Sequence, residues 1–402
     1  MFDLNAFISR EVIKRPNSMF LRDIENNREK LSEKIEGKTV LVIGGAGSIG
    51  SSFIKAVLTF RPKTLVVIDT NENALAELTR DLRSTKEMYV PEDYIPYPMD
   101  FASPVFEKML RKRKGFDIVG NFSAHKHVRS EKDIYSVEAL LQNNVLHAKL
   151  LLDLLVEFPP EEYFCVSTDK AANPVNIMGA SKRIMEDVIF SYSDKFPVKT
   201  ARFANVAFSN GSLPAGFLAR LQKLQPLSAP SDVKRYFVSP DESGQICMLS
   251  CMLGENREIF FPRLEEAQMI TFDKIATALI REYGYEVLQC DNDEEAIDKA
   301  QQLKAGSKQY PVHYSGSNTS GEKAFEEFYT EKECVDLDRM KALGIVTKKE
   351  VPEKEKIKIL FEELNRAFNR EEITKDEVVS IMKAYLPNFE HVETGKSLDS
   401  KM

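Results

Sequence analysis

The chain has 402 residues, 43% of them hydrophobic, and a formal net charge of −7 at pH 7. This length allows two or three domains with a substantial core. The acidic balance argues against a nucleic-acid partner, which would favour a basic surface. No apolar run reaches the roughly 18 residues that a membrane-spanning helix needs. The first 20 residues lack the apolar centre of a signal peptide.

The cysteines are few and irregularly spaced. No second pair and no histidine cluster completes a zinc-binding pattern around them. We therefore expect reduced, structural thiols in a cytoplasmic protein and no metal site. The five residues concerned are Cys165, Cys247, Cys251, Cys290 and Cys334.

Residues 1–37 are expected to form a helical extension, and its amphipathic start leaves contact with a membrane surface as an alternative. A regular alternation of elements follows. Continuous apolar, β-branched runs predict strands buried on both faces, and apolar residues at helical spacing predict helices between them. The strands are expected near residues 39–43, 64–68, 94–99, 116–122 and 162–168, and helices over 72–83, 103–113 and 137–156.

Strands that alternate with helices indicate an α/β fold, here a Rossmann-type doubly wound parallel sheet. The order loosens after about residue 215, which favours a smaller mixed α/β substrate-binding lobe, and both termini are expected to be helical extensions. The predicted division is an extension over 1–37, an NAD-binding domain over 38–214 with a return over 236–284, a lobe over 215–235 and 285–340, and a tail over 341–402.

Gly44, Gly47 and Gly50 form a G-x-x-G-x-x-G pattern between the first strand and its helix, with Ser48 and Ile49 inside it. Such a turn lets the backbone approach a pyrophosphate at a helix N-terminus. Alone the pattern is weak, since a simple glycine turn would also produce it.

Asp69 ends the next strand, where a carboxylate can bind the ribose hydroxyls and would repel a 2′-phosphate, so NAD is favoured over NADP. A helix cap is the alternative role for Asp69. Asp100, with Phe101 beside it, follows the third strand and is the candidate for the adenine amine.

Residues 167–183, STDKAANPVNIMGASKR, resemble a Tyr-x-x-x-Lys dehydrogenase signature, but Met178 replaces the tyrosine. A thioether has no ionisable hydrogen, so Met178 cannot transfer a proton. Lys182 retains the lysine position, expected at the nicotinamide ribose. Thr168, Asp169 and Lys170 directly follow a strand, at the edge where such sheets bind ligands, and can supply the missing acid–base chemistry.

Together these motifs identify a resemblance. GGAGSIG (44–50), the 167–183 segment, ARFANV (201–206) and KRYF (234–237) resemble the capsular-polysaccharide type of nucleotide-sugar 4,6-dehydratase. That family lies within the extended short-chain dehydrogenases/reductases, and the chain is similar to its subgroup with methionine at the tyrosine position. The resemblance covers about residues 38–335.

The resemblance implies an NAD-dependent reaction on a nucleotide sugar, by default UDP-N-acetylglucosamine, and a homodimer or larger homo-oligomer paired through the long helices. Thr168 and Asp169 would act on the C4 hydroxyl, Lys170 would remove the C5 hydrogen, and Asp169 would protonate the leaving C6 hydroxyl. The remaining cofactor contacts would come from Ser123, Ala124, Asn144 and Ser167. The substrate contacts would come from Lys126, His127, Asn205, Ser212, Arg235, Glu322 and Lys323.

One departure concerns the nucleotide. The family's GLRPGEK becomes GSNTSGEK at residues 316–323, which removes the arginine expected at the nucleotide, so the base stays open. Two other functions also remain open. An epimerase would use the same transient 4-ketone and keep the C6 oxygen, and a nicotinamide-binding scaffold would not turn over.

Overall fold

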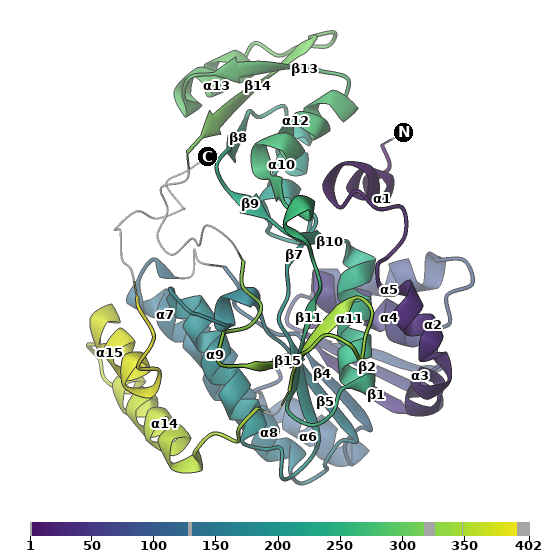
Figure 1. Ribbon diagram of the computed structural model, residues 1–402, viewed down its shortest axis with the longest axis vertical. Helices are drawn as coiled ribbons and strands as arrows, with labels where there is room; N and C mark the ends of the chain where they lie inside the picture. Colours follow the sequence, from purple (N-terminus) through teal and green to yellow (C-terminus); the bar gives the residue numbers. More distant parts are fainter. Residues whose placement is uncertain (1, 128–130, 317–325, 348, 392–402) are drawn as a thin grey trace.

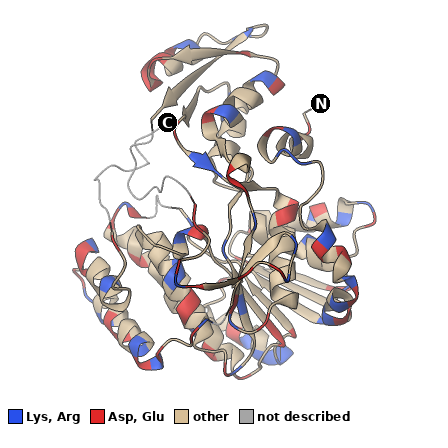
Figure 2. Ribbon diagram, in the orientation of Figure 1, with Lys and Arg blue, Asp and Glu red and all other residues tan. Residues whose placement is uncertain are grey.

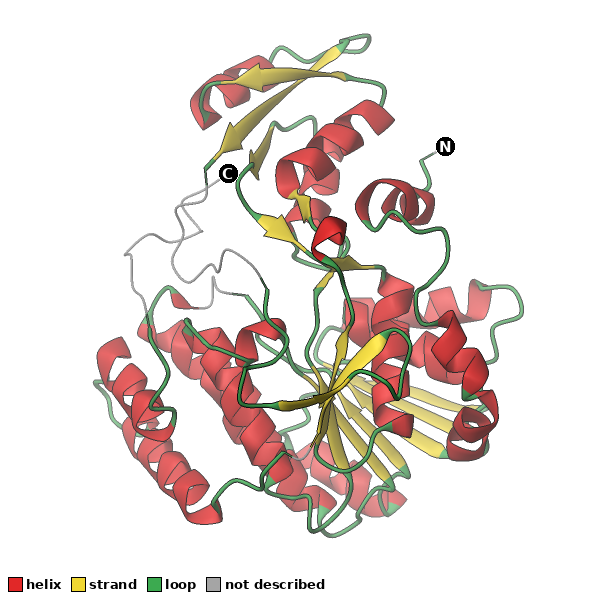
Figure 3. Ribbon diagram, viewed as in Figure 1, coloured by secondary structure: helices red, strands yellow, loops and turns green. Residues whose placement is uncertain are grey.

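One large sheet organises the computed structural model, which describes residues 2–127, 131–316, 326–347 and 349–391 (Figures 1 and 3). Within these residues its strand order is β15-β16-β11-β6-β5-β4-β1-β2-β3. The strands from β3 to β11 run parallel, whereas β16 and β15 are antiparallel to their neighbours. In spatial order they are Cys334–Asp336, Leu343–Thr347, Glu258–Pro262, Val198–Ala201, Glu162–Val166, Ile118–Asn121, Thr39–Ile43, Thr64–Asp69 and Asp93–Pro98.

Helices cover both faces of this sheet, which confirms the predicted doubly wound α/β class. α4, α5 and α11 lie on one side of it and α6 to α9 on the other (Figure 1). Charged residues gather on the outer helices, and most of the strand ribbon carries none (Figure 2). The bounds are Ser48–Leu58 (α4), Glu72–Ser84 (α5), Pro104–Arg113 (α6), Ile134–Leu141 (α7), His147–Leu155 (α8), Ile177–Phe190 (α9) and Pro240–Leu253 (α11).

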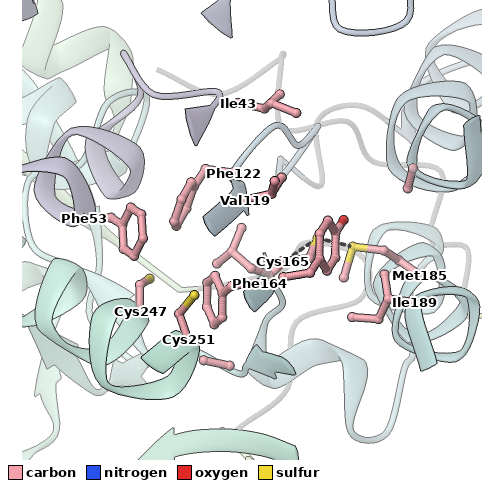
Figure 4. Packing of buried hydrophobic residues seen from close by; sticks show 14 of the residues in the cluster. Ile43, Phe53, Val119, Phe122, Phe164, Cys165, Met185, Ile189, Cys247 and Cys251 are labelled. Atoms are coloured by element: carbon pink, nitrogen blue, oxygen red, sulfur yellow. Dashed lines mark hydrogen bonds between the residues drawn. The ribbon is translucent and has the colours of Figure 1, made fainter. Parts of the chain in front are cut away.

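The centre of the core shows why the strands are apolar throughout. Successive side chains of β5 point to opposite faces, so Phe164 meets Cys247 and Cys251 of α11 while Cys165 meets Met185 of α9 (Figure 4). These cysteines are free thiols packed as small apolar groups.

The lobe has its own apolar core. Among the described residues it contains β13, β14 and β8 in one parallel sheet, the β9–β12 pair, and the helices α10, α12 and α13. α12 was predicted with the large domain, but its Ile275 and Leu279 are buried in the lobe core, so the lobe extends across it. The elements are α10 (Leu213–Gln222), β8 (Leu227–Pro230), β9 (Lys234–Arg235), β12 (Ile270–Thr271), α12 (Phe272–Glu282), β13 (Glu286–Cys290), α13 (Asp293–Ala300) and β14 (Gln309–Ser315). β7 (Asn205–Val206) pairs with β10 (Phe237–Val238).

The amino-terminal segment contacts both cores. Phe7, in α1 (Leu4–Phe7), is buried in the lobe core, whereas Leu31, in α3 (Arg28–Ile35), is buried in the main core after α2 (Leu21–Asn26). Between them the Arg15 guanidinium donates 2.6 and 2.7 Å hydrogen bonds to Glu242, which is buried at the start of α11. The predicted extension is therefore integral to the packing of both parts.

The carboxyl-terminal segment begins differently from the predicted helical tail, because residues 343–347 form β16 inside the main sheet. Two helices follow, α14 (Lys354–Phe368) and α15 (Lys375–Tyr385). They lie against α8 and α9: the Lys149 ammonium sits 5.7 Å from the Phe361 ring centroid, and the Tyr385 hydroxyl donates to Asp187 at 3.4 Å. No helix of the described residues is both long and apolar enough to span a membrane.

A buried cluster of ion pairs connects the chain around Phe328 and Glu333 to the main sheet. Arg202, which is fully buried after β6, donates two hydrogen bonds of 2.8–3.0 Å to Glu186 of α9 and two to Glu333. Its fifth N–H donor bonds the carbonyl oxygen of Phe328 at 2.9 Å. Burial pushes the pKa of Glu186 up, but the Arg202 charge and hydrogen bonds outweigh it and leave that pKa below its ordinary value. Every guanidinium donor is thus satisfied.

Replacing Arg202 by methionine should destabilise the protein by about 3–5 kcal/mol, because Glu186 and Glu333 lose the fully buried cation that they share. Each keeps a second ion pair, with Arg183 and Lys349 respectively. Urea unfolding measures the change. The control is Arg366→Met, whose ion pair with Glu363 is largely exposed and should cost at most about 1 kcal/mol. An Arg202→Met variant as stable as this control would contradict the assignment.

Candidate active site

In the glycine turn between β1 and α4, a side chain at Gly44 or Gly50 would collide with backbone atoms. Gly44 has φ +69°, and a Cβ there would lie 2.6 Å from the Ser123 nitrogen. A Cβ on Gly50 would lie 2.3 Å from the carbonyl oxygen of Gly44. α4 starts at Ser48 without a side-chain cap, so its first N–H groups are available to an anion. The turn therefore has the form that a pyrophosphate site requires.

Two carboxylates lie at the ends of neighbouring strands. Asp69, at the end of β2, accepts hydrogen bonds of 3.0 Å from the backbone nitrogens of Ala46 and Asn71. It therefore lies directly beside the glycine turn. Asp100 follows β3, is exposed, and accepts a 2.8 Å bond from the Ala102 nitrogen. Phe101 beside it is buried.

Asn144 braces the loop that follows β4. It lies in a π-helical turn, Gln142–Leu146, between α7 and α8. Its side chain accepts from the backbone nitrogen of His125 and donates to the carbonyl oxygen of His125, both at 2.9 Å, and it donates to the Ser181 hydroxyl at 3.1 Å. The Asn144 amide thus connects α9 to the loop after β4, which contains Ser123 and Ala124. Its surroundings indicate a positioning residue for the predicted cofactor site.

Ser167 and Lys182 are buried where β5 meets α9. The Ser167 hydroxyl donates to Glu186 at 2.7 Å, and the Lys182 ammonium donates to the carbonyl oxygen of Val166 at 3.1 Å. Burial lowers the pKa of Lys182, against the opposing effect of Cys165 and Glu186. Both side chains lie next to the segment Thr168–Lys170 in sequence or in space, and their contact with a cofactor stays a prediction.

Thr168, Asp169 and Lys170 form a compact acid–base group at the carboxyl end of β5. The Thr168 hydroxyl donates to Asp169 Oδ1 at 2.7 Å, and the Lys170 ammonium donates to the same oxygen at 3.1 Å. Asp169 is 6% exposed, whereas Lys170 is partly open to solvent. The three side chains that were predicted together are therefore in direct contact.

Met178 occupies the first turn of α9 with its side chain in the main core, 3% exposed. Its backbone nitrogen donates to Glu131 at 2.9 Å, and the Ile177 nitrogen donates to the same carboxylate at 3.1 Å. A Cβ on Gly179 would lie 2.6 Å from the carbonyl oxygen of Lys170. The start of α9 is thus packed tightly against the acid–base group. The apolar side chain of Met178 occupies the position of the tyrosine in the Tyr-x-x-x-Lys signature.

The described residues predicted to contact the substrate come from several elements: Lys126 and His127 follow β4, Asn205 lies in β7, Ser212 precedes α10, and Arg235 lies in β9. Arg235, in β9, is buried, and its guanidinium donates to the carbonyl oxygen of Lys234 at 2.8 Å. The His127 ring lies against Gly211, and Lys126 is exposed. Ser212 accepts from the Ala215 nitrogen and caps α10, a structural role that the sequence analysis did not anticipate. Glu322 and Lys323 lie outside the described residues.

Glu326 is the site residue that the sequence analysis missed. Its carboxylate accepts hydrogen bonds from the Asn205 amide and, at 2.8 Å, from the backbone nitrogen of Tyr236. Burial and the nearby Asp169 carboxylate raise the pKa of Glu326 to about 7. The only sequence feature that could have indicated Glu326 is the pair of acidic residues in AFEEF, residues 324–328. This pair follows the Glu-Lys that the chain shares with the family pattern.

The sheet, the glycine turn and the acid–base group at the carboxyl edge define a Rossmann-type α/β protein with a site between strand ends. The family described as "Polysaccharide biosynthesis protein" matches residues 40–348. The chain belongs to this family.

Among the curated relatives, the "Uncharacterized membrane protein MJ1061" of Methanocaldococcus jannaschii is 29% identical over 86% of this chain and 97% of that protein. The "UDP-N-acetylglucosamine 4,6-dehydratase (inverting)" of Campylobacter jejuni is 22% identical over 75% of this chain and 84% of that protein. The match to the "Probable polysaccharide biosynthesis protein EpsC" of Bacillus subtilis, 26% identical, covers 80% of this chain but 50% of EpsC.

Solved structures share the fold. Pen from Bacillus thuringiensis superposes with a TM-score of 0.63 at 18% identity, covering 88% of this chain and 98% of Pen. DesIV, a dTDP-glucose 4,6-dehydratase from Streptomyces venezuelae solved with NAD and TYD bound, gives 0.53 at 20% identity, covering 73% and 89%. These likenesses support the Rossmann-type architecture.

Gly50→Ala should lower the free energy of unfolding by about 1–3 kcal/mol, because the added methyl group collides with the Gly44 carbonyl and the turn must open. Gly47→Ala is the matched control, since its nearest neighbour would lie 3.4 Å away, and it should cost less than about 1 kcal/mol. Urea unfolding of both variants measures the difference. Equal effects would contradict the close approach at Gly50.

Proposed function

We propose that the protein is an NAD-dependent nucleotide-sugar 4,6-dehydratase for surface-glycan biosynthesis. The observation that carries the proposal is the contact between Asp169 and Lys170 at the carboxyl end of β5, with the non-ionisable Met178 in place of a tyrosine. The expected substrate is UDP-N-acetylglucosamine and the expected product a UDP-4-keto-6-deoxy-N-acetylhexosamine. The name of the Campylobacter relative supports this reaction.

The residues present fit a bound dinucleotide. Side chains are excluded at Gly44 and Gly50, the start of α4 is uncapped, and the Asp69 carboxylate lies beside the turn. A carboxylate there favours NAD, because it would repel the extra phosphate of NADP. When bound, NAD would supply the hydride acceptor for the sugar C4 and the hydride donor for C6.

The side chains of this chain would move the protons. Asp169, with Thr168 bonded to it, would accept the proton of the C4 hydroxyl as the ketone forms. The ketone acidifies the C5 hydrogen, which Lys170 would remove. Asp169, protonated by the first step, would then return its proton to the departing C6 hydroxyl, so that water leaves and the carboxylate is restored. As hydride returns to C6, Lys170 would deliver a proton to C5, which completes the keto product and restores the free amine.

The rival reaction is 4-epimerisation, which other relatives suggest, since UDP-glucose 4-epimerases of Rickettsia match 60–61% of this chain. Incubation with UDP-N-acetylglucosamine in D₂O followed by mass spectrometry separates the candidates. A dehydratase gives loss of water with deuterium at C5. An epimerase gives a product of unchanged mass, and a scaffold gives no product.

Asp169→Asn and Lys170→Ala should each lower the dehydration rate at least about 100-fold, since each removes a positioned proton-transfer group. The surface pair Asp194 and Lys195 offers a matched control, with an ammonium–carboxylate distance of 3.5 Å and both side chains about half exposed. Asp194→Asn and Lys195→Ala should leave the rate unchanged. Full activity in Asp169→Asn and in Lys170→Ala would refute the mechanism.

A further inference from the structure

Glu131 caps the start of α9 from a distant part of the chain. Its Oε1 accepts a hydrogen bond of 2.9 Å from the Met178 backbone nitrogen, and its Oε2 accepts one of 3.1 Å from the Ile177 nitrogen. The side chain of Asn176, the local cap, accepts from the Gly179 nitrogen at 2.7 Å. A local cap is enough to begin a helix, whereas a carboxylate from another segment also fixes where the helix begins in space.

The first turn of α9 contacts the acid–base group. A Cβ on Gly179 would lie 2.6 Å from the carbonyl oxygen of Lys170, so the backbones of the two segments are in direct contact. The Lys170 ammonium in turn donates to Asp169 at 3.1 Å. A shift of the first turn of α9 would therefore move the two side chains that are proposed to transfer protons.

The carboxyl-terminal segment contacts Glu131 at two points. The Lys375 ammonium, at the start of α15, donates a 2.8 Å hydrogen bond to the backbone carbonyl oxygen of Glu131. The Nε2 atom of His391, which follows α15, lies 3.9 Å from Glu131 Oε2, and both side chains are 9% exposed. Phe389 is buried in the main core, which anchors the chain just before His391. Main chain and side chain of Glu131 are thus both held by this segment.

We propose that Glu131 is a positioning residue for the proton-transfer pair Asp169 and Lys170, and that Lys375 and His391 hold it in place. Glu131 acts through the first turn of α9: the carboxylate fixes the turn, and the turn fixes the main chain of Lys170. The helices α14 and α15 are then part of the scaffold of the active site. This role rests on the proposed dehydratase function, because it concerns the geometry of that proton transfer.

The first test measures kcat and KM for dehydration of UDP-N-acetylglucosamine, per mole of folded full-length protein, in the wild type, Lys375→Met and Lys375→Arg. Methionine loses the donor to Glu131, so kcat should fall at least about threefold, since misplaced groups transfer protons slowly. KM should change less than about twofold, because Asn205 and Arg235, predicted to bind the substrate, lie in β7 and β9. Arginine keeps a charged donor and should restore most of kcat.

Lys383→Met is the matched control, since Lys383 lies exposed in the last turn of the same helix and should be replaceable without loss of rate. Glu131→Gln removes the charge and one of the two acceptor oxygens, so kcat should fall about tenfold or more with little change in KM.

A merely structural role would reduce the yield or stability of these variants and leave kcat per folded molecule unchanged, and that result would overturn the proposal. So would equal losses of kcat in Lys375→Met and Lys383→Met, or a failure of Lys375→Arg to restore the rate.

A second measurement does not depend on turnover. Amide hydrogen exchange, followed by mass spectrometry, should be at least about tenfold faster at Ile177 and Met178 in Lys375→Met and in Glu131→Gln than in the wild type. Lys383→Met should exchange like the wild type. Unaltered exchange at Ile177 and Met178 in both test variants would overturn the proposal. If the wild type does not dehydrate the sugar, the proposed function fails, whereas this exchange still decides whether the carboxyl-terminal segment holds the start of α9.

Discussion

The five hydrogen bonds of the Arg202 guanidinium are the interaction on which the geometry of the site most depends. They join the end of β6, which Arg202 directly follows, the helix α9 that carries Glu186, and the segment from Phe328 to Glu333. Glu186 also accepts a hydrogen bond from the hydroxyl of Ser167, which immediately precedes the acid–base group in sequence. A buried pair of this kind contributes little net stability over apolar packing, but losing one partner is costly. Its main effect here is to fix where chain segments meet.

The exchange of a phenol for Met178 has a clear physical consequence. The first turn of α9 packs as core, and the backbone nitrogens of Ile177 and Met178 donate to Glu131. Gly179 then lets the helix contact the Lys170 carbonyl oxygen directly. The turn that carries Asp169 and Lys170 is thus in close contact with the start of α9, which suits the fixed geometry that the proposed proton transfer would need.

The main sheet and the Asp169–Lys170 contact were predictable because both follow from local patterns. Buried strands are continuous apolar runs, and carboxyl ends of parallel strands share one edge. Glu326 was not predictable, since its place depends on Arg202 packing more than 120 residues away in sequence. β16 was missed because its five residues precede a charged helical pattern that dominates that region. The cap that Ser212 forms on α10 and the bonds from Asn144 to His125 were not predicted either, because a polar residue in a motif does not reveal its local hydrogen-bond partners.

The two helices after β16 change what the outer surface of α8 and α9 can do. In this chain that surface is already occupied in part by α14 and α15, through the Lys149–Phe361 and Tyr385–Asp187 contacts. A symmetric pairing of two copies through bare long helices would have to displace these contacts. Any assembly that keeps them must instead present α14 and α15 themselves at the subunit boundary, or use a different face of the molecule.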